Sequence, residues 1–341
     1  MPETPPRSSL PDPTATGLLW RPAAMGDLEN WAGLIAGTAA VERPAWYEKH
    51  GDLIHILQST TNDPRTSTLL GFDAQGVARA YGRIEKKPDG EKATGMGCVD
   101  PQWQHRGIGS AVLAWQEEQT RERFARDAAA GHPSHQPRLR IRTEEQHQHQ
   151  SALLERRGYR AIRWFNEMHR PLSEPVPQRP LARGLEFRPL EPSLYEAVRL
   201  AHNEAFRDHW GSELRDEESW RFTMEEPTAR HDWSSVVVDS SSGEVAGYQL
   251  ASYDPVAAAD RGFKEGYTEL LGVRRQYRGR GVGQSLLAEA MRRFADAGMD
   301  VASLDVDSAN PTGALALYLG MGYAAVARSM TWEKILQPLT S

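Results

Sequence analysis

The chain has 341 residues, of which 39% are hydrophobic and 25% charged, and its formal net charge is −6. This length is too great for one ordinary compact domain and fits two domains of about 150 to 170 residues. The single cysteine excludes an internal disulfide and favours a reducing cytoplasm. The negative charge argues against nucleic acid as the main partner.

The first 17 residues, MPETPPRSSLPDPTATG, are rich in proline and contain acidic residues. They lack the apolar centre of a signal peptide, so residues 1–17 are predicted to form a disordered tail. No apolar run in the sequence approaches the roughly 20 residues needed to span a bilayer. The sequence therefore predicts a cytoplasmic protein without a membrane partner.

The rest of the chain repeats one plan twice, and repeats often reveal the fold. Four matching pairs occur in the same order: Leu19–Pro22 with Glu186–Pro189, Ala78–Tyr81 with Val245–Tyr248, Val99–Gly109 with Val273–Gly283, and Gly158–Tyr159 with Gly322–Tyr323. The numbering offset between halves falls from 174 in the third pair to 164 in the fourth. That fall coincides with a turn-rich stretch of the first half, AAAGHPSHQP at 128–137, which is predicted to be a surface loop.

Each half is predicted to contain a strand, one or more helices, a hairpin, and a strand that leads through a glycine-rich turn into a helix. Strand, helix and final strand follow, and in the second half these are predicted at Val301–Val306, 312–319 and Ala324–Trp332. This alternation predicts an α/β fold in which helices cover a mixed sheet. A proline-rich stretch at 171–184 separates the halves and is typical of a stiff, extended linker.

The most informative segment runs from the predicted strand Thr268–Val273 through a basic turn into a helix. That helix is predicted to bury residues at helical spacing: Val282, Leu286, Leu287, Ala290 and Phe294. The turn carries three glycines, at 279, 281 and 283, and four arginines, Arg274, Arg275, Arg278 and Arg280. Glycines let a ligand approach the backbone closely, and the first turn of a helix offers free N–H groups and a positive dipole end. A diphosphate fits such a site, although the glycines could also be simple turn punctuation.

Two other phosphate-binding motifs fit this segment less well. No G-K-[ST] follows the glycines, which excludes a Walker loop. The segment also lies late in the repeat, whereas a dinucleotide fingerprint opens a βαβ unit.

Residues Arg278–Gly283 and Gln104–Gly109 both resemble the R/Q-x-x-G-x-G/A signature of GCN5-related N-acetyltransferases (GNAT). Residues Asn310–Tyr323 resemble the later motif of that family, N-x-x-A-x-x-L-Y-x-x-x-G-F/Y. The sequences of Ala205–Gly211 and Val306–Ala314 are similar to those of tandem actinobacterial members of the mycothiol synthase type. The resemblance implies two tandem GNAT domains, at 18–172 and 184–341 with a linker at 173–183. Each would be a mixed, mostly antiparallel sheet flanked by helices.

The resemblance implies an N-acetyltransferase that moves the acetyl group of acetyl-CoA directly to a primary amine of a small molecule, without a metal. The loop backbone would hold the CoA pyrophosphate, and an N–H of the splayed strand before it would bind the oxyanion. Gly272 would permit that distortion of the strand. Asn310 would bond the pantetheine arm or cap the following helix. The implied cofactor-binding residues are Leu271, Gly272, Val273, Arg278, Gly279, Arg280, Gly281, Val282, Gly283, Gln284 and Asn310.

Proton transfer needs an acid and a base. Tyr318 lies where the family has its general acid and would protonate the leaving thiolate, unless it is only a core tyrosine. Glu269 lies in an otherwise apolar strand, where a carboxylate costs free energy unless it is paired or functional, and is the candidate base. Asp305 and Asp307 are rival bases because period 2 places both on one face of the next strand. A salt-bridged or solvated structural role stays open for all three acids.

The first half keeps the loop and departs from the rest of the pattern. Its implied CoA-binding residues are Val99, Gln104, His105, Arg106, Gly107, Ile108 and Gly109. Aligned by offset, the positions of Glu269, Tyr318 and Asn310 are taken here by Gly95, Leu154 and Gln146. We therefore expect catalysis in the second half alone. The first half would bind CoA without turnover, or serve only as scaffold and substrate wall.

Three weaker features have plain structural interpretations. Cys98 lies on a strand expected to be buried, as a structural thiol. His147 and His149 are two residues apart, do not share a helix face, and are expected at a solvated surface. Residues 208–211 are expected to line the acceptor pocket or to form a local turn.

Two other functions stay open from the sequence alone. One is a non-catalytic acyl-CoA-binding or sensing protein, and the other is an acetyltransferase for basic peptides. Intact Tyr318 and Asn310 favour the small-molecule enzyme. The identity of the amine and the oligomeric state, with a monomer as one option, do not follow from the sequence.

Overall fold

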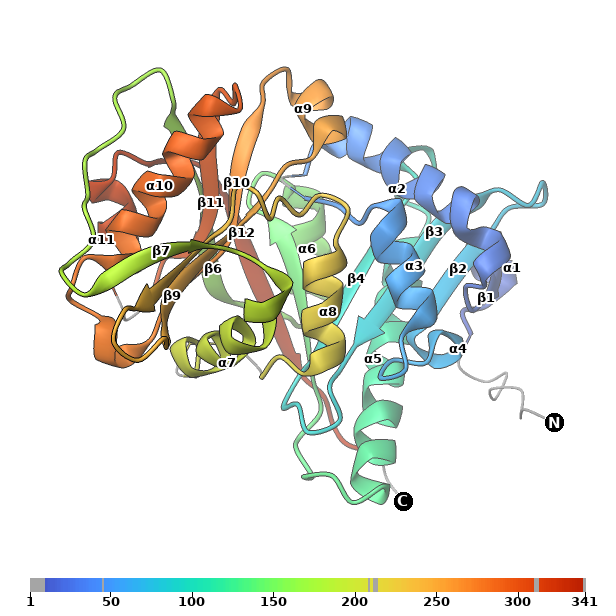
Figure 1. Ribbon diagram of the computed structural model, residues 1–341. Helices are drawn as coiled ribbons and strands as arrows, with labels where there is room; N and C mark the ends of the chain where they lie inside the picture. Colours follow the sequence, from blue (N-terminus) through green and yellow to red (C-terminus); the bar gives the residue numbers. More distant parts are fainter. Residues whose placement is uncertain (1–9, 45, 208, 211–213, 310–312, 340–341) are drawn as a thin grey trace. The chain divides into compact units, whose positions relative to one another are not determined.

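The computed structural model describes residues 10–44, 46–207, 209–210, 214–309 and 313–339. The chain forms two compact units (Figure 1). Unit 1 holds the residues up to Arg163 and those from Ser329 onward, and unit 2 runs from Trp164 to Arg328. Each unit is a mixed sheet with helices, which confirms the predicted α/β fold. Among the described helices, none is both long enough and apolar enough to cross a membrane.

Unit 1 follows the predicted order of elements. It begins with α1 (Pro13–Thr16), β1 (Leu19–Arg21), the 3-10 helix η2 (Met25–Asp27), α2 (Leu28–Glu42), α3 (His50–Gln58) and α4 (Pro64–Ser67). It continues with β2 (Thr68–Phe72), β3 (Ala78–Glu85), β4 (Ala93–Val99), η3 (Pro101–Trp103), α5 (Ile108–Ala129), β5 (Arg138–Glu144) and α6 (Gln148–Arg156). Its sheet has the strand order β1-β2-β3-β4-β5-β12, in which only β4 and β5 are parallel neighbours.

Unit 2 repeats this plan. It contains most of β6 (Arg160–Pro171), then β7 (Leu185–Pro189), η4 (Pro192–Leu194), α7 (Tyr195–Ala205), α8 (Glu217–Glu225), β8 (Ser235–Asp239) and β9 (Val245–Ser252). These are followed by α9 (Pro255–Arg261), β10 (Glu265–Val273), η5 (Arg275–Tyr277), α10 (Val282–Asp296), β11 (Val301–Asp307), α11 (Ala314–Gly320) and the start of β12 (Ala324–Ile335). Its sheet has the order β6-β11-β10-β9-β8-β7, with β10 and β11 parallel.

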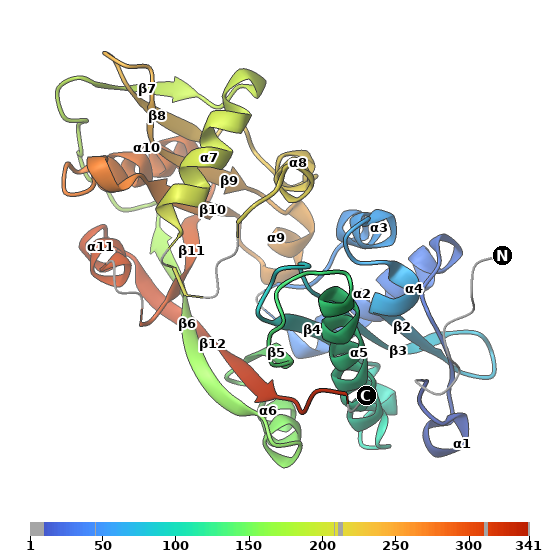
Figure 2. The same cartoon turned by 90° about the horizontal axis from the view of Figure 1, so that it is seen from below.

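The last strand of each repeat contributes to the sheet of the other unit. Residues 165–171 of β6 pair with β11 in unit 2, and residues 329–335 of β12 pair with β5 in unit 1 (Figure 2). The predicted final strand at Ala324–Trp332 therefore exists, but backbone pairing places its end in unit 1. The expected ranges 18–172 and 184–341 follow the repeated sequence instead, and they stay a prediction about the domains.

Two local expectations are wrong in part. Residues 13–16 of the predicted disordered tail form α1, because Asp12 caps the helix and the Trp20 indole donates to Thr16 Oγ1 at 2.8 Å. Residues 1–9 lie outside the described chain. Ala128 and Ala129, predicted as loop, end α5, which has 22 residues where α10 has 15. A longer helix therefore explains most of the change in offset.

Residues 173–183 of the predicted linker have neither helix nor strand, as their prolines indicate, whereas Pro171 ends β6. The linker is not a free tether, however, because Val176 packs against one apolar cluster of unit 2 and Leu181 and Ala182 pack against another. Burial of these side chains fixes the segment to the unit.

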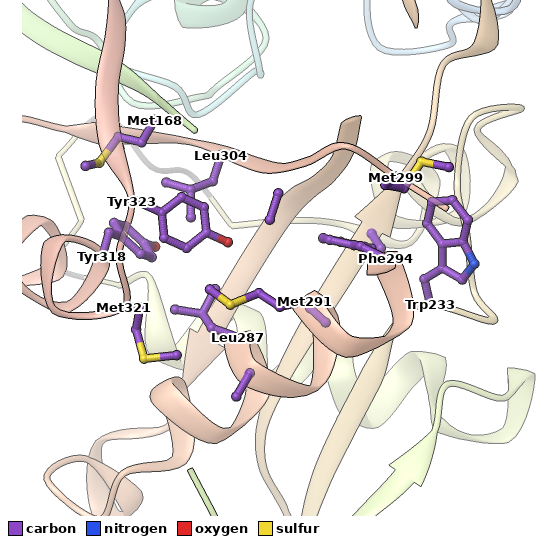
Figure 3. Packing of buried hydrophobic residues seen from close by; sticks show 14 of the residues in the cluster. Met168, Trp233, Leu287, Met291, Phe294, Met299, Leu304, Tyr318, Met321 and Tyr323 are labelled. Atoms are coloured by element: carbon purple, nitrogen blue, oxygen red, sulfur yellow. The ribbon is translucent and has the colours of Figure 1, made fainter. Parts of the chain in front are cut away.

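The two faces of the unit 2 sheet carry different helices. On the α10 face, Ala251, Leu304 and Val306 of the strands pack with Leu287 and Met291 of α10, and Figure 3 shows part of this cluster. On the α7 face, Tyr248 and Leu250 pack with helices α7 and α8. The five helical positions predicted to be buried in α10 are at most 1% exposed, which confirms that prediction. The strands between these faces carry the candidate site.

Candidate active site

Strands β10 and β11 pair with each other over only the first part of their length. Their parallel pairing covers Glu265–Tyr267 against Val301–Ser303 and then stops in the described chain. Beyond that point β10 pairs only with β9, and β11 pairs only with β6. The sheet thus has an open edge of β10 at residues 268–273, on the stretch where the sequence resemblance implied a splayed strand.

A β-bulge interrupts β10 where the open edge begins. The register against β9 shifts between Thr268, which pairs with Ala251, and Leu270, which pairs with Leu250. Glu269 is the extra residue, and a bulge turns a side chain out of the regular alternation. The side chain of Glu269 is exposed.

The bulge overturns the alignment of Glu269 with Gly95. Strand β4 pairs with β3 without a register shift, and Gly95 lies opposite Ile84. At the offset of 167 between the two hairpins, Ile84 corresponds to Ala251, the partner of Thr268. Gly95 therefore corresponds to Thr268, and Glu269 is an insertion without a counterpart in β4.

A serine on the neighbouring strand holds the Glu269 carboxylate. The Ser252 hydroxyl donates a hydrogen bond of 2.6 Å to Glu269 Oε1. Ser252 follows Tyr248 and Leu250 at intervals of two along β9, so it lies on the α7 face. The carboxylate is therefore on the face opposite α10.

The backbone of β10 presents alternate N–H groups to the open edge. The Arg274 N–H donates to a β9 carbonyl at 3.0 Å, so the backbone groups of Arg274 and Gly272 face β9. Those of Leu271 and Val273 face the other way, and Val273 O accepts from Arg278 Nε at 3.2 Å. Of the three residues proposed as oxyanion donors, Leu271 and Val273 are thus oriented to donate, and Gly272 is not.

Gly272 has a different role, which predicts the outcome of a substitution. A Cβ at this position would lie 2.4 Å from the buried ring of Tyr248, whose hydroxyl is bonded to His202 at 2.5 Å. We expect Gly272→Ala to destabilise the protein by about 1–3 kcal/mol, because the ring must move, and to lower the acetyl transfer that the resemblance implies, by displacing Leu271. Thermal unfolding and rate measurements check this. Gly33→Ala in α2, where a Cβ meets nothing within 4 Å, is the control and should lower neither the Tm nor the rate. An unchanged Tm for Gly272→Ala would contradict the predicted clash with Tyr248.

The glycine-rich loop after β10 offers an array of unused backbone donors. Gly279 and Gly281 have φ of 74° and 76°, and Gly281 caps the start of α10. Within the part of the chain that the structure describes, the N–H groups of residues 279–284 have no acceptor, and the next one, Ser285 N, donates to Gly281 O. A Cβ added at Gly279 or Gly281 would meet nothing within 4 Å, so the loop is open to a ligand. Such an array binds anions.

The loop arginines mostly fix the loop. Arg274 Nε donates to Glu204 at 2.6 Å, and Arg278 donates to the carbonyl of Ala205 at 2.8 Å, so both tie the loop to the end of α7. Arg280 is exposed and lies over the Tyr277 ring, with 5.5 Å from its Cζ to the ring centroid. The backbone, with exposed Arg280 beside it, is therefore the main anion-binding element.

Tyr318 lies in α11, on the α10 side of the sheet. It is 8% exposed and belongs to the cluster that also holds Leu271, and its ring meets that of Tyr323 edge-on at 6.0 Å between centroids. Figure 3 shows the two tyrosines side by side. Burial raises the pKa of Tyr318 to about 12, which keeps the phenol protonated at neutral pH.

Two further acids lie on the α7 face of the sheet, as Glu269 does. Asp305 and Asp307 lie there because Leu304 and Val306, which alternate with them, pack on the α10 face. Asp305 is half-buried and Asp307 is 3% exposed, with one oxygen accepting from the Ala309 N–H at 3.0 Å. The two rival bases therefore share a face, as predicted.

A charged network on the same face was missed from the sequence. Glu167 and His169 of β6 are joined at 2.8 Å, and Arg261 of α9 bonds Glu167 at 3.2 Å and Glu265 of β10 at 2.8 Å. Glu167, His169 and Glu265 have the atoms of a metal site, all within 4.8 Å of one another. The Arg261 guanidinium already neutralises both carboxylates, so the geometry fits an ion-pair network better than a cation site. Its members come from segments about 100 residues apart, which no local motif reveals.

Unit 1 has the same loop conformation without the same residues. His105 and Gly107 have φ of 62° and 80°, at the positions of Gly279 and Gly281, and α5 begins at Ile108 as α10 begins at Val282. Gln104 Nε2 lies 3.4 Å from Val99 O, and Arg106 stacks on the Trp103 ring at 4.6 Å. The pairing of β4 with β5 likewise ends at Gly95–Ile141. The seven residues expected to contact CoA in this half thus form one loop beside a second open edge.

The remaining expectations have mixed outcomes. Asn310, Asp208 and Gly211 lie outside the described residues, and Trp210 packs 6.5 Å from Phe165. Burial raises the pKa of the Cys98 thiol to about 12, which suits a structural role. The solvated surface predicted for His147 is wrong, because its side chain is 8% exposed and bonded to the carbonyl of Glu42 at 2.8 Å.

Comparison with known proteins identifies the family of the chain. The sequence profile of the acetyltransferase (GNAT) family matches residues 195–323. The mycothiol acetyltransferase of Salinispora arenicola is 30% identical over 280 residues, which are 76% of this chain and 79% of that protein. The chain belongs to the GNAT family. A second relative, the mycothiol acetyltransferase of Streptomyces bingchenggensis, is 31% identical over 273 residues. These residues are 78% of this GNAT chain and 80% of that relative.

Solved structures share the tandem fold. The GCN5-related N-acetyltransferase of Sphaerobacter thermophilus has a TM-score of 0.70 at 22% identity, over 97% of this chain and 98% of that one. The tandem GNAT protein from the clavulanic acid biosynthesis pathway has a TM-score of 0.64 at 16% identity, over 95% of this chain and 100% of that one. The fold is therefore shared over the full length, and the protein is an acetyl-CoA-dependent N-acetyltransferase.

Proposed function

We propose that unit 2 transfers the acetyl group of acetyl-CoA directly to a primary amine of a small molecule, in a ternary complex and in the cytoplasm. One observation carries the proposal: the sheet opens between β10 and β11, with a carboxylate on one face and a buried phenol on the other. A thioester in this opening would meet the amine from the α7 face and release its sulfur on the α10 face.

The loop would bind CoA through its backbone. The unused N–H groups of residues 279–284 suit the pyrophosphate, because a helix N-terminus adds a positive dipole end to the donors. The N–H groups of Leu271 and Val273 face the open edge, where the pantetheine arm and the thioester would lie. Asn310 would bond that arm. These residues form the proposed CoA site, together with Gly272 beneath them.

The chemistry then needs three groups. Glu269 accepts a proton from the ammonium, directly or through water, and the neutral amine attacks the thioester carbonyl. The Leu271 N–H stabilises the oxyanion that forms as the C–N bond is made. The C–S bond breaks as Tyr318 donates a hydrogen bond to the departing sulfur. The acylated nitrogen releases its surplus proton, which neutralises the thiolate, so the products are the acetamide and CoA. The acids along the α7 face favour an acceptor that arrives as a cation.

The bond from Ser252 predicts a separable effect. Ser252→Ala removes a hydrogen bond that helps to orient the Glu269 carboxylate, so we expect a lower kcat with an unchanged KM for acetyl-CoA, whose site it does not touch. Ser252→Thr keeps the hydroxyl and should retain more of the rate. Steady-state kinetics with acetyl-CoA and amine varied separately check this, and a rise in KM for acetyl-CoA alone would argue against the role.

A screen tests the proposed function as a whole. The full-length protein is incubated with acetyl-CoA and a panel of small amines and basic peptides, and acetylated products are read by mass spectrometry. We expect acetamides of small amines that Tyr318→Phe and Glu269→Gln form far more slowly. Binding of acetyl-CoA with no product across the panel would favour a non-catalytic acyl-CoA-binding protein. Peptide products alone would favour the peptide acetyltransferase.

The relatives favour one acceptor over others. The proteins named mycothiol acetyltransferase match across both halves of the chain. We therefore propose, as the first amine to test, the cysteinyl amine of a cysteinyl aminosugar-inositol. A kcat/KM for this amine no higher than for simple amines would remove this candidate and leave the general assignment intact.

A further inference from the structure

In unit 1 a carboxylate bridges the two sides of the open edge. Glu42 is the last residue of α2, and its side chain is 13% exposed. Its carboxylate accepts hydrogen bonds from Gln104 at 2.8 Å and from Gln150 at 3.0 Å, and it lies 3.4 Å from His149 Nε2. Four described side chains thus meet at one point.

These partners come from opposite sides of the parting strands. Gln104 opens the loop that follows β4, whereas His149 and Gln150 lie in the first turn of α6, which follows β5. The buried His147 adds a second link, because its Nε2 is 2.8 Å from the carbonyl oxygen of Glu42. A ligand that runs from the loop into the opening between β4 and β5 would have to cross this bridge.

The sequence of unit 2 has no polar residues at the three equivalent positions. At the offset of 164, His147, His149 and Gln150 correspond to proline, glycine and alanine at 311, 313 and 314, none of which carries a polar side chain. The end of α7 meets the loop differently, because the Glu204 carboxylate accepts from Arg274 and the Ala205 carbonyl accepts from Arg278, both of which belong to the loop itself. A carboxylate bridge therefore cannot form there in the same way.

A leucine side chain also lies closer to the start of the helix in unit 1. A Cβ at Gly109, in the first turn of α5, would lie 3.1 Å from Leu153 of α6. At the matching Gly283 of α10, a Cβ would lie 3.6 Å from Leu317 of α11. The start of α5 is thus more tightly covered than the start of α10.

We propose that Glu42 closes the CoA site of unit 1, so that each chain binds a single CoA, in unit 2. The backbone of the loop keeps its anion-binding conformation, even with His105 in place of a glycine. A pyrophosphate and its pantetheine arm would have to displace a carboxylate held by side chains from both sides, and would meet its negative charge. This inference rests on the proposed CoA site of unit 2. It chooses the scaffold role for the first half over CoA binding without turnover.

Native mass spectrometry of the full-length protein with free CoA tests this proposal. We expect one CoA per wild-type chain and a second on Glu42→Ala, with slower amide hydrogen exchange at residues 105–110 only in the variant. Glu42→Gln, which keeps an acceptor but loses the charge, should show a weaker second site. Glu29→Ala, at an exposed site on the same helix, is the matched control and should bind as the wild type does.

The outcomes separate this inference from the proposed function. Two CoA molecules on the wild-type chain, or no additional CoA on Glu42→Ala while its Tm and acetyl transfer are intact, would overturn the inference. No CoA on the wild-type chain but one on Glu42→Ala, with exchange slowed at 105–110, would uphold the closure of unit 1 by Glu42 and contradict the proposed site of unit 2.

Discussion

Replacing Tyr318 by phenylalanine is expected to lower kcat by about 10²–10³-fold, the usual loss when one hydrogen bond to a developing negative charge is removed, with little change in KM for acetyl-CoA. The substitution removes one oxygen and keeps the ring in its buried cluster, so the fold should hold. Because burial raises the pKa of Tyr318 to about 12, the phenol is protonated throughout the range from pH 7 to 10. The ratio of wild-type to variant rates should therefore be constant over that range, and kcat measured across it checks this.

The same raised pKa defines what the phenol does. A thiolate is the weaker base, since thiols ionise near pH 8.5, so a phenol of pKa about 12 stabilises the departing sulfur mainly by a hydrogen bond. Loss of the wild-type advantage above pH 9 would contradict this, because it would mean that the phenol ionises there.

Tyr323 provides a matched control. It is 2% exposed, it packs against Tyr318, and its hydroxyl has no hydrogen-bond partner among the described residues. Tyr323→Phe should leave the rate nearly unchanged and the stability equal or higher, because it removes an unsatisfied buried group. Equal losses of rate in both variants would assign Tyr318 to packing rather than to catalysis.

The parts of the fold that sequence predicted correctly depend on local signals. The buried face of α10 follows from the helical spacing of Val282, Leu286 and Phe294, and the loop follows from glycines that adopt positive φ. His105 could not be predicted in this way, because it adopts a positive φ without being a glycine. The conformation there depends on the surrounding strand and helix.

The parts that sequence did not predict depend on contacts between distant segments. The insertion of Glu269 is visible only once Thr268 and Leu270 are paired with β9, since alignment by offset counts residues and not ladder partners. The bridge at Glu42 joins residues 62 to 108 positions away. The exchange of β6 and β12 between units likewise needs three-dimensional pairing, because each strand alone fits its own half equally well.

Replacing Glu269 by glutamine is expected to lower kcat/KM for the amine by about 10²–10⁴-fold near neutral pH, with KM for acetyl-CoA unchanged. The amide has the shape of the carboxylate and can still accept from Ser252, but it cannot take a proton. The variant must draw on the small fraction of free amine in solution, so its rate should keep rising with pH while the wild-type rate levels off. Kinetics at several pH values with one amine check this.

Two controls decide whether the bulge gives Glu269 its role. Glu265→Gln alters a carboxylate on the same strand that is already held by Arg261 and Ser303, so its loss of rate should be much smaller. Asp305→Asn tests the rival base. If Asp305→Asn reproduced the pH dependence expected for Glu269→Gln, and Glu269→Gln did not, the base would be Asp305. In that case the bulge would serve only to open the edge of β10. If only Glu269→Gln shows this pH dependence, the residue inserted in β10 and missing from β4 would account for the catalysis proposed for unit 2 alone.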